Sequence, residues 1–385
     1  MSDRTTYGQD LAPVTLGQPT VGAEELAAVA EVFRSGWLAG DGPTCRLFEE
    51  EFAAAVGTEH ALAVANCTAA LHLALLALGV GPGDEVIVAD YTFPATGHAV
   101  LFTGATPVFA DVLADTATVD PASVLALIGP KTVGVIAVDT AGLPADYARL
   151  TELTQRHGLF LIEDAACSAG ATYQGARAGT LAPIACFSFH GRKGITAGEG
   201  GALVTKDAAI DAKARKLHAF GISSAHDRAA QRDLTVPEFA ELGHNYKLSD
   251  VAAAILRVQL TRIPELIQRR SAIAAAYVSD LAGSAGVTLP VEPDDRTHAW
   301  QSYVLTLDRA IDRGAVATAL REQGIGCTFG TYASHLQPVY GTTNACPTSA
   351  DLFRRHLTIP MHANLSEADV LRVGRGVREA IARTR

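Results

Sequence analysis

The first two thirds of the chain alternate between helical patterns and short apolar runs. Apolar residues recur at helical spacing in Ala23–Arg34 and Leu47–Val56. Thr68–Leu78 predicts a further helix, because it is rich in Ala and Leu, opens with a threonine and ends at Gly79. Short apolar runs predict buried strands over Glu85–Ala89, Pro107–Ala110, Val133–Val138, Leu159–Ile162, Ala185–Phe189 and Gly201–Thr205. Short strands between helices indicate an α/β fold with a mainly parallel sheet covered on both faces.

The pattern changes near Pro264, where a long helical stretch, Glu265–Ala282, begins. The elements that follow are a strand-like Ser302–Leu307, a helix Gly314–Gln323 and a terminal helix after Ser366. We interpret this part as a second, smaller α+β domain. Because 385 residues exceed one typical domain, we expect a large domain over 1–260, with the N-terminal segment, and a small domain over 261–385.

Composition narrows the class of protein. The net charge is −10 and no run of Lys or Arg occurs, so we expect no nucleic-acid partner. No stretch approaches the roughly 18 uninterrupted apolar residues of a membrane span, and the start, MSDRTTYGQDLAPV, lacks the apolar core of a signal peptide. We therefore expect a cytoplasmic protein without membrane contact. The six cysteines form no C-x-x-C pair and the histidines show no ligand spacing, so we expect reduced thiols and no metal site.

The most informative segment runs from Cys186 to Gly201. Lys193 lies there between an apolar strand and a glycine-rich turn. A lysine at a strand end can be desolvated, which lowers its pKa and provides the neutral amine that Schiff-base chemistry requires. The glycines allow the backbone to approach a flat ring or a phosphate closely. The alternative, a solvated loop lysine, is the more frequent case for any single lysine.

Other polar and aromatic residues also follow predicted strands or begin a predicted helix. Asp164 closes an apolar strand and could hold a ring nitrogen protonated, with a helix cap as the alternative. Thr68 begins a helix, where free amides and the dipole favour a phosphate, and Ser188 could add a hydroxyl. Phe93 could stack on a flat heterocycle. The ordinary explanations are a helix cap for Thr68, a strand residue for Ser188 and a core ring for Phe93. Because ligands bind at the carboxyl ends of parallel strands, we expect these residues to share one crevice with Lys193.

The sequence resembles the DegT/DnrJ/StrS-type sugar aminotransferases, which have fold type I of the aspartate aminotransferases. The resemblance spans nearly the whole chain. The segments that carry it are Ser35–Leu38, Thr68–Leu75, Gly81–Val88, Glu163–Ala166, Phe187–His190, Lys193, Gly198–Gly201, Gly243–Asp250, His335–Pro338 and Leu357–His362. The lysine segment followed by Gly-Glu-Gly-Gly and the Asn-Tyr-Lys segment are its most specific markers. The resemblance implies a large domain with a mainly parallel sheet and a smaller C-terminal α+β domain.

The resemblance also implies a cofactor, pyridoxal 5′-phosphate (PLP), bound covalently to Lys193. Lys193 would then move protons during turnover, Asp164 would pair with the pyridine nitrogen and Phe93 would stack on the ring. Phosphate contacts are implied for Thr68, the Ala69 amide, Ser188 and, from the neighbouring subunit, Asn245. A contact from the neighbouring subunit implies a homodimer with shared active sites, and a dimer is also the commonest oligomer.

The chain departs from the family pattern at several places. Cys167 stands where Gln or His usually contacts the ring hydroxyl, and a thiol is a weaker hydrogen-bond partner. Asn66-Cys67-Thr68 replaces the frequent Ser-Gly-Thr. Val138–Gly142 lacks the usual His and aromatic residue, and Phe329–Tyr332 replaces the more frequent Val-His-Tyr. The last two segments lie where the family contacts its acceptor substrate, which points to an atypical acceptor.

The implied reaction is a two-stage transamination. L-Glutamate or L-glutamine would donate an amino group to a keto sugar, most simply a nucleotide-linked keto-deoxysugar, in amino-sugar or antibiotic biosynthesis. Alternatives are a keto-cyclitol acceptor, a PLP-dependent lyase, or a non-catalytic PLP or sugar-nucleotide sensor. Related dehydratases carry His at the position of Lys193, so lysine favours transamination. Candidates for contacting the substrates are Trp37, His190, Arg192, Tyr332 and His335.

Overall fold

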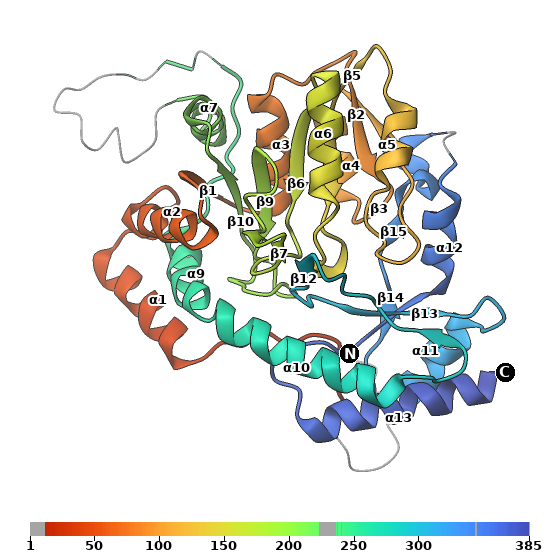
Figure 1. Cartoon of the computed structure of the whole chain (residues 1–385). Helices are drawn as coiled ribbons and strands as arrows, with labels where there is room; N and C mark the ends of the chain where they lie inside the picture. The colour runs from red at the N-terminus through yellow and green to blue at the C-terminus, as the bar shows by residue number, and fades with distance from the viewer. Residues whose placement is uncertain (1–11, 223–235, 237, 240, 343–344, 385) are drawn as a thin grey trace.

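A seven-stranded sheet forms the centre of the larger part of the chain (Figure 1). The computed structural model describes residues 12–222, 236, 238–239, 241–342 and 345–384. The strands lie in the order β1 (His60–Val64), β10 (Gly201–Thr205), β9 (Ile184–Ser188), β6 (Phe160–Asp164), β5 (Thr132–Val138), β2 (Glu85–Ala89) and β4 (Thr106–Ala110). The five strands from β9 to β4 are parallel, and β10 runs antiparallel to both of its neighbours. The predicted α/β fold with a mainly parallel sheet is confirmed.

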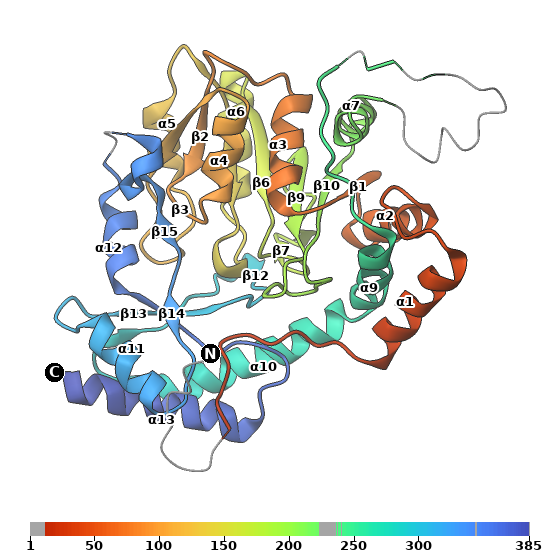
Figure 2. The same ribbon diagram turned by 180° about the vertical axis from the view of Figure 1, so that it is seen from behind.

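Helices cover both faces of this sheet, as the two opposite views show (Figures 1 and 2). The helices on one face are α3 (Cys67–Ala77), α4 (Ala95–Phe102) and α7 (Ala208–His218). The other face is covered by α5 (Pro121–Leu127), α6 (Tyr147–His157), α2 (Pro43–Val56) and α9 (Asp250–Thr261), with α1 (Ala23–Ser35) against α9. Every central strand is therefore apolar on both sides, which explains its continuous apolar sequence.

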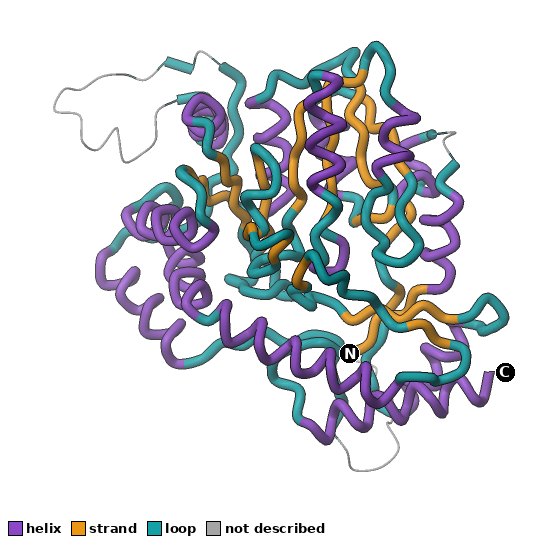
Figure 3. The backbone as a smooth tube through the Cα atoms, viewed as in Figure 1, coloured by secondary structure: helices purple, strands orange, loops and turns teal. Residues whose placement is uncertain are grey.

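A second sheet lies below the first in Figure 3 and carries the C-terminal elements. Its antiparallel strands are β11 (Val287–Thr288), β13 (Tyr303–Leu307), β16 (His356–Ile359) and β14 (Thr328–Phe329). The helices that share its apolar core are α10 (Ile263–Leu281), α11 (Arg313–Glu322) and α13 (Glu367–Thr384). Val14 from the N-terminal segment packs in the same core and pairs with Ile325. The division into domains at residue 260 stays a prediction.

Short pairings connect the two parts of the chain. β3 (Tyr91–Thr92) pairs with β15 (Tyr332–Ala333). A three-stranded sheet contains β12 (Arg296–Thr297), β7 (Thr172–Tyr173) and β8 (Ala176–Arg177), and the remaining helix is α12 (Pro347–Arg355). These pairings hold the C-terminal sheet beside the carboxyl ends of the parallel strands. In the described part of the chain, every helix is too short or too polar to cross a membrane.

The structure corrects several predicted boundaries. Helix α3 begins at Cys67 instead of Thr68, because the side chain of Asn66 accepts the Ala69 amide and acts as the N-cap. Helix α2 begins at Pro43, since proline suits the first turn of a helix. Strand β1 was not predicted, because its residues, His60–Val64, include two alanines and a leucine and resemble the neighbouring helices in composition.

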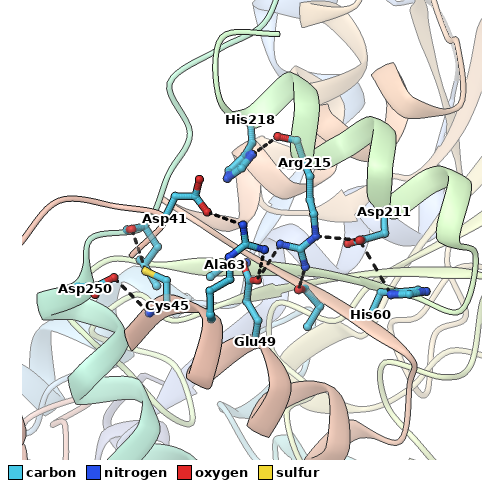
Figure 4. Close-up of polar contacts among 12 residues, drawn as sticks. Asp41, Cys45, Glu49, His60, Ala63, Asp211, Arg215, His218 and Asp250 are labelled. Carbon is cyan, nitrogen blue, oxygen red and sulfur yellow. Dashed lines mark hydrogen bonds and ion pairs between the residues drawn. The ribbon is translucent and has the colours of Figure 1, made fainter. Parts of the chain in front are cut away.

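A buried ionic network holds β1 between α2 and α7 (Figure 4). Arg215 of α7 donates to Glu49 of α2 at 2.7 Å, to Asp211 at 2.8 Å and to the carbonyl of Ala61 at 2.5 Å. Glu49 also accepts the amide of Ala63 at 2.8 Å. Burial outweighs the attraction of Arg215 and raises the pKa of Glu49. The network fixes the strand whose end leads directly into the N-terminus of α3.

Candidate active site

A cavity of about 300 Å³ lies between the carboxyl ends of the parallel strands and the second sheet. Such a crevice is where open α/β sheets bind ligands. The residues from the sequence analysis that line it are Phe93, Asp164, Cys167, His190, Arg192 and Lys193. Residues from widely separated segments therefore meet at one site, as their positions after strands predicted.

Lys193 follows β9 and is half-buried in the cavity wall. Its Nζ donates a hydrogen bond to Sγ of Cys167 at 3.1 Å. Burial alone lowers the pKa of Lys193, but Cys167, Cys67 and Asp164 together raise it above the ordinary value. The expectation of a lowered pKa was therefore wrong, because it considered burial without the neighbours that the fold brings to the amine.

Asp164 closes β6 and is only 4% exposed. Its Oδ2 accepts the hydroxyl of Thr96 at 2.8 Å, and its Oδ1 accepts the amide of Ala166 at 3.2 Å and lies 3.9 Å from Sγ of Cys67. Burial raises the pKa of Asp164 despite these hydrogen bonds. The carboxyl group is thus fixed in orientation at the cavity wall, where a protonated ring nitrogen would stabilise its ionised form. Thr96, which holds it, was not identified from the sequence.

A pair of carboxyl groups, Asp139 and Glu163, lies buried behind Asp164. Asp139 accepts the hydroxyls of Ser168 at 2.5 Å and Tyr147 at 2.9 Å. Burial raises the pKa of Asp139 to about 7, and burial together with Asp139 raises the pKa of Glu163 well above its ordinary value. Two buried carboxyl groups that repel each other cannot both ionise cheaply, so burial and this repulsion favour the protonated form of the pair. Asp139 belongs to the segment that departs from the family pattern.

The predicted phosphate seat lies at the N-terminus of α3. Gly201 pairs with Ser188, and a Cβ at Gly201 would lie 2.5 Å from the carbonyl carbon of Asn66, so only glycine allows β10 to approach this close. Ser188 and the start of α3 are therefore neighbours, as a shared phosphate requires. The Ala69 amide, however, donates to Oδ1 of Asn66 at 2.9 Å. The first-turn amides of Cys67 and Thr68 have no acceptor within the helix, and the phosphate roles of Thr68, Ala69 and Ser188 stay predictions.

Phe93 presents an exposed ring to the cavity. It follows β3 and is 58% exposed. The ring of Tyr332, on the paired strand β15, lies 6.0 Å from it edge to face. Tyr332 itself does not line the cavity, although its neighbours Gly330 and Thr331 do. A large aromatic face left open in a pocket suits a flat heterocycle.

The remaining predicted residues differ in position. His190 and Arg192 lie at the cavity, with Arg192 exposed and Nε2 of His190 3.8 Å from Glu199. Trp37, His335 and Asn245 are not among the residues that line this subunit's cavity. Their proposed contacts with substrate or cofactor stay predictions.

His335 is held by Asp90, which accepts its amide at 2.6 Å and its ring Nδ1 at 2.7 Å. With Cys346 these two residues form the one group, within the described ranges, whose donor atoms lie close enough for a metal. Sγ of Cys346 instead donates to the carbonyl of Phe109 at 3.5 Å, and burial raises the pKa of the thiol. Hydrogen bonds therefore supply partners for all three residues of this group.

Lys193, Asp164 and Phe93 together fit PLP. The three side chains offer a nucleophilic amine, a fixed carboxyl group and an open aromatic face within one cavity. The start of α3, with its free amides, lies next to Asp164, because Sγ of Cys67 is 3.9 Å from Oδ1 of Asp164. The donor set therefore matches the aldehyde, ring nitrogen, ring face and phosphate of the cofactor.

Comparisons with known proteins agree with this geometry. The model of the DegT/DnrJ/EryC1/StrS aminotransferase family matches residues 19–378. The spore coat polysaccharide biosynthesis protein SpsC of Bacillus subtilis (strain 168) is 37% identical over 373 residues, which are 94% of this chain and 96% of that protein. DesI, solved in the presence of its TDP-sugar product, is 34% identical with a TM-score of 0.88, over 97% of this chain and 94% of that one.

The PMP form of the putative sugar aminotransferase Spr1654 from Streptococcus pneumoniae superposes with a TM-score of 0.91 and 26% identity. It covers 97% of this chain and 100% of that one. High structural similarity over nearly the whole length confirms the PLP-transferase fold. The chain belongs to the DegT/DnrJ/EryC1/StrS aminotransferase family and is a PLP-dependent aminotransferase.

Proposed function

We propose that this aminotransferase moves an amino group from L-glutamate or L-glutamine to a nucleotide-linked keto-deoxysugar, on an amino-sugar or antibiotic pathway. The observation that carries the proposal is the meeting of Lys193, Asp164 and the exposed ring of Phe93 at one cavity. The name of SpsC and the TDP-sugar product of DesI support a sugar acceptor with a nucleotide carrier. Because the chain is an aminotransferase, the sensor alternative is not carried further.

Bound PLP supplies a carbonyl group that condenses with amines and a ring that accepts electron density from the substrate carbon. Lys193 Nζ would hold the cofactor and would move a proton at the donor α-carbon and later at the carbon that receives the amino group. Asp164 holds the proton on the ring nitrogen and stabilises the charge that develops. Asp164 also raises the pKa of Lys193, and pairing with a protonated nitrogen would offset that effect and favour the neutral amine.

Arg192 supports a phosphate-bearing acceptor. Its guanidinium is exposed beside the cavity, and a guanidinium suits bidentate binding of phosphate. A keto-cyclitol has no phosphate and would not use this cation. The two acceptor classes therefore differ in their dependence on Arg192.

The acceptor class can be tested on the amine-loaded enzyme. A panel of nucleotide-linked keto-deoxysugars, free keto sugars and keto-cyclitols is added, and the return of the Lys193-bound chromophore is followed by absorbance. We expect the nucleotide-linked sugars to restore it fastest, and Arg192→Ala to raise their KM about tenfold. Arg156→Ala, on the exposed side of α6, is the matched control. Restoration by a keto-cyclitol alone would replace the proposed acceptor with the runner-up.

We further propose a homodimer in which Asn245 reaches the phosphate seat of the partner subunit. Asn245 is exposed, accepts Lys247 Nζ at 2.6 Å and is not among the residues that line its own cavity. Large exposed apolar side chains that an interface would cover are Leu26, Phe33, Phe102, Phe220 and Leu242. Mixing Lys193→Ala with Asn245→Ala subunits should restore part of the activity, since one site of each heterodimer would be intact. No recovery in heterodimers confirmed by mass spectrometry would refute the shared site.

A further inference from the structure

The second sheet presents one face to its helices and the other to the cavity. Along β13, Tyr303, Leu305 and Leu307 are buried in the apolar core with α10, α11 and α13. Val304 and Thr306 alternate with them and line the cavity. Because successive residues of a strand point to opposite faces, the sheet forms a wall of the cavity opposite the parallel strands.

Cross-strand pairing arranges the cavity-facing side chains of this sheet into two rows. The first row is Thr288, Thr306 and His356, and the second is Thr328, Thr358 and Val304. Four of the six side chains carry a hydroxyl group. We call this surface the threonine face. Its members come from four strands, so their spacing is fixed by the backbone register.

The hydroxyls of the threonine face differ in their partners. Thr358 donates to the carbonyl of Phe329 at 3.1 Å. Within the described residues, the hydroxyls of Thr288, Thr306 and Thr328 bond to no protein group, and all three line the cavity. A hydroxyl both donates and accepts, so three of them at fixed spacing match the hydroxyl groups of a sugar or cyclitol ring.

The threonine face is also uncharged. Burial lowers the pKa of His356 to about 4 and that of His298, a further residue of the wall, to about 3, so both are neutral near pH 7. The acidic residues, lysines and arginines that line the cavity are Asp115, Asp164, Arg192 and Lys193, none of them in the second sheet. A neutral wall does not favour the carboxylates of an amino donor or the phosphates of a nucleotide.

We propose that the threonine face is the subsite for a neutral polyhydroxylated ring of the acceptor, with Thr288, Thr306 and Thr328 as its hydrogen-bond partners. The inference rests on the proposed function, because it places the acceptor in the same cavity as Lys193. It adds the residues that determine specificity. The ring hydroxyls bind to the C-terminal sheet, whereas the charged groups of either substrate bind on the side of Arg192.

Threonine to valine substitutions test the subsite, since valine has the same shape and favours strands. The probes are a TDP-linked 4-keto-6-deoxyhexose and 2-keto-myo-inositol, each added to the amine-loaded enzyme. For whichever acceptor the wild type turns over, Thr306→Val should raise the KM by about fivefold to tenfold. The double variant Thr306→Val with Thr328→Val should raise that KM further. The half-reaction with L-glutamate and the control Thr318→Val, exposed on α11, should stay within about twofold of wild type.

The outcomes separate this inference from the proposed function. An unchanged acceptor KM in both valine variants, with normal wild-type turnover, overturns the subsite and leaves transamination standing. If wild type turns over neither probe, the proposed acceptor is wrong. The subsite is then tested separately, by the binding of myo-inositol. Millimolar myo-inositol should raise the melting temperature of the wild-type holoenzyme, and the double variant should lose that shift. The absence of a shift in wild type, or an equal shift in both proteins, overturns the subsite.

Discussion

The two walls of the cavity differ in charge and in how their polar atoms are partnered. On the side of the parallel strands, the charged wall, Asp164 and Lys193 carry ionisable groups, and each is held by hydrogen bonds to other protein groups. On the threonine face, Thr288, Thr306 and Thr328 are neutral, and their hydroxyls are open to the cavity. Groups that stabilise developing charge must be fixed in advance, whereas groups that recognise a substrate must be free to bind it. The difference assigns the chemistry to one wall and the recognition to the other.

The largest effect should follow from removing the amine of the charged wall. Lys193→Ala should lower kcat by about a thousandfold or more, because both the covalent attachment and the proton transfer are lost. Steady-state rates measure this, with the exposed Lys206→Ala as control. A Lys193→Ala enzyme that transaminates at a rate near wild type would contradict the assignment of chemistry to this wall.

Asp164→Asn should have the next largest effect. The amide has no charge to hold a proton on the ring nitrogen, so kcat should fall about a hundredfold to a thousandfold in both half-reactions. Asp115→Asn removes a charge from the exposed rim of the same cavity and should leave kcat within about twofold. Equal losses in the two variants would show that overall cavity charge matters, and not the position of Asp164.

The carboxyl pair behind the charged wall should appear in the pH dependence of stability. The pKa of Asp139 is raised from 3.8 to about 7, so between these values the folded state binds more protons than the unfolded state. The free energy of unfolding should therefore fall as pH rises through this window, by up to about 1.4 kcal/mol per unit. Urea unfolding from pH 5 to 8 should show a flatter dependence for Asp139→Asn. An identical slope in variant and wild type would mean that Asp139 does not titrate in this window.

The smallest effect concerns the ring of Phe93. Phe93→Leu should weaken PLP binding about fivefold to tenfold, because one stacking contact contributes on the order of 1 kcal/mol. Fluorescence titration of apoenzyme with PLP measures the Kd. Phe239→Leu replaces an exposed ring, 67% exposed, that lies outside the cavity wall, and should bind PLP normally. If both variants bind PLP equally well, Phe93 has no stacking role.

The strand ends were predictable because buried parallel strands are continuous apolar runs that stop where polar residues meet the crevice. The positions of Asp164, Lys193 and Phe93 after predicted strands therefore indicated one shared cavity from the sequence alone. Side-chain partners were not predictable, since hydrophobic pattern encodes burial and not contacts. The N-cap role of Asn66 and the raised pKa of Lys193 both depend on neighbours that only the fold brings together.

The C-terminal sheet shows a signal that the sequence contained but that was not used. Tyr303–Leu307 alternates large apolar residues with Val304 and Thr306, which already predicts two different faces. The register that aligns Thr306 with Thr288 and His356 required the structure. The alternation along a strand therefore predicts which residues share a face. The function of that face depends on whether it contacts the core, solvent or a cavity, which the fold decides.

The central claim is that Lys193 alone carries the cofactor, at the charged wall. The most direct measurement is reduction of PLP-loaded protein with borohydride, followed by proteolysis and mass spectrometry of the peptides. The account predicts that the added mass of reduced PLP lies on Lys193. Modification of another lysine, or an unmodified Lys193 in fully loaded protein, would contradict it.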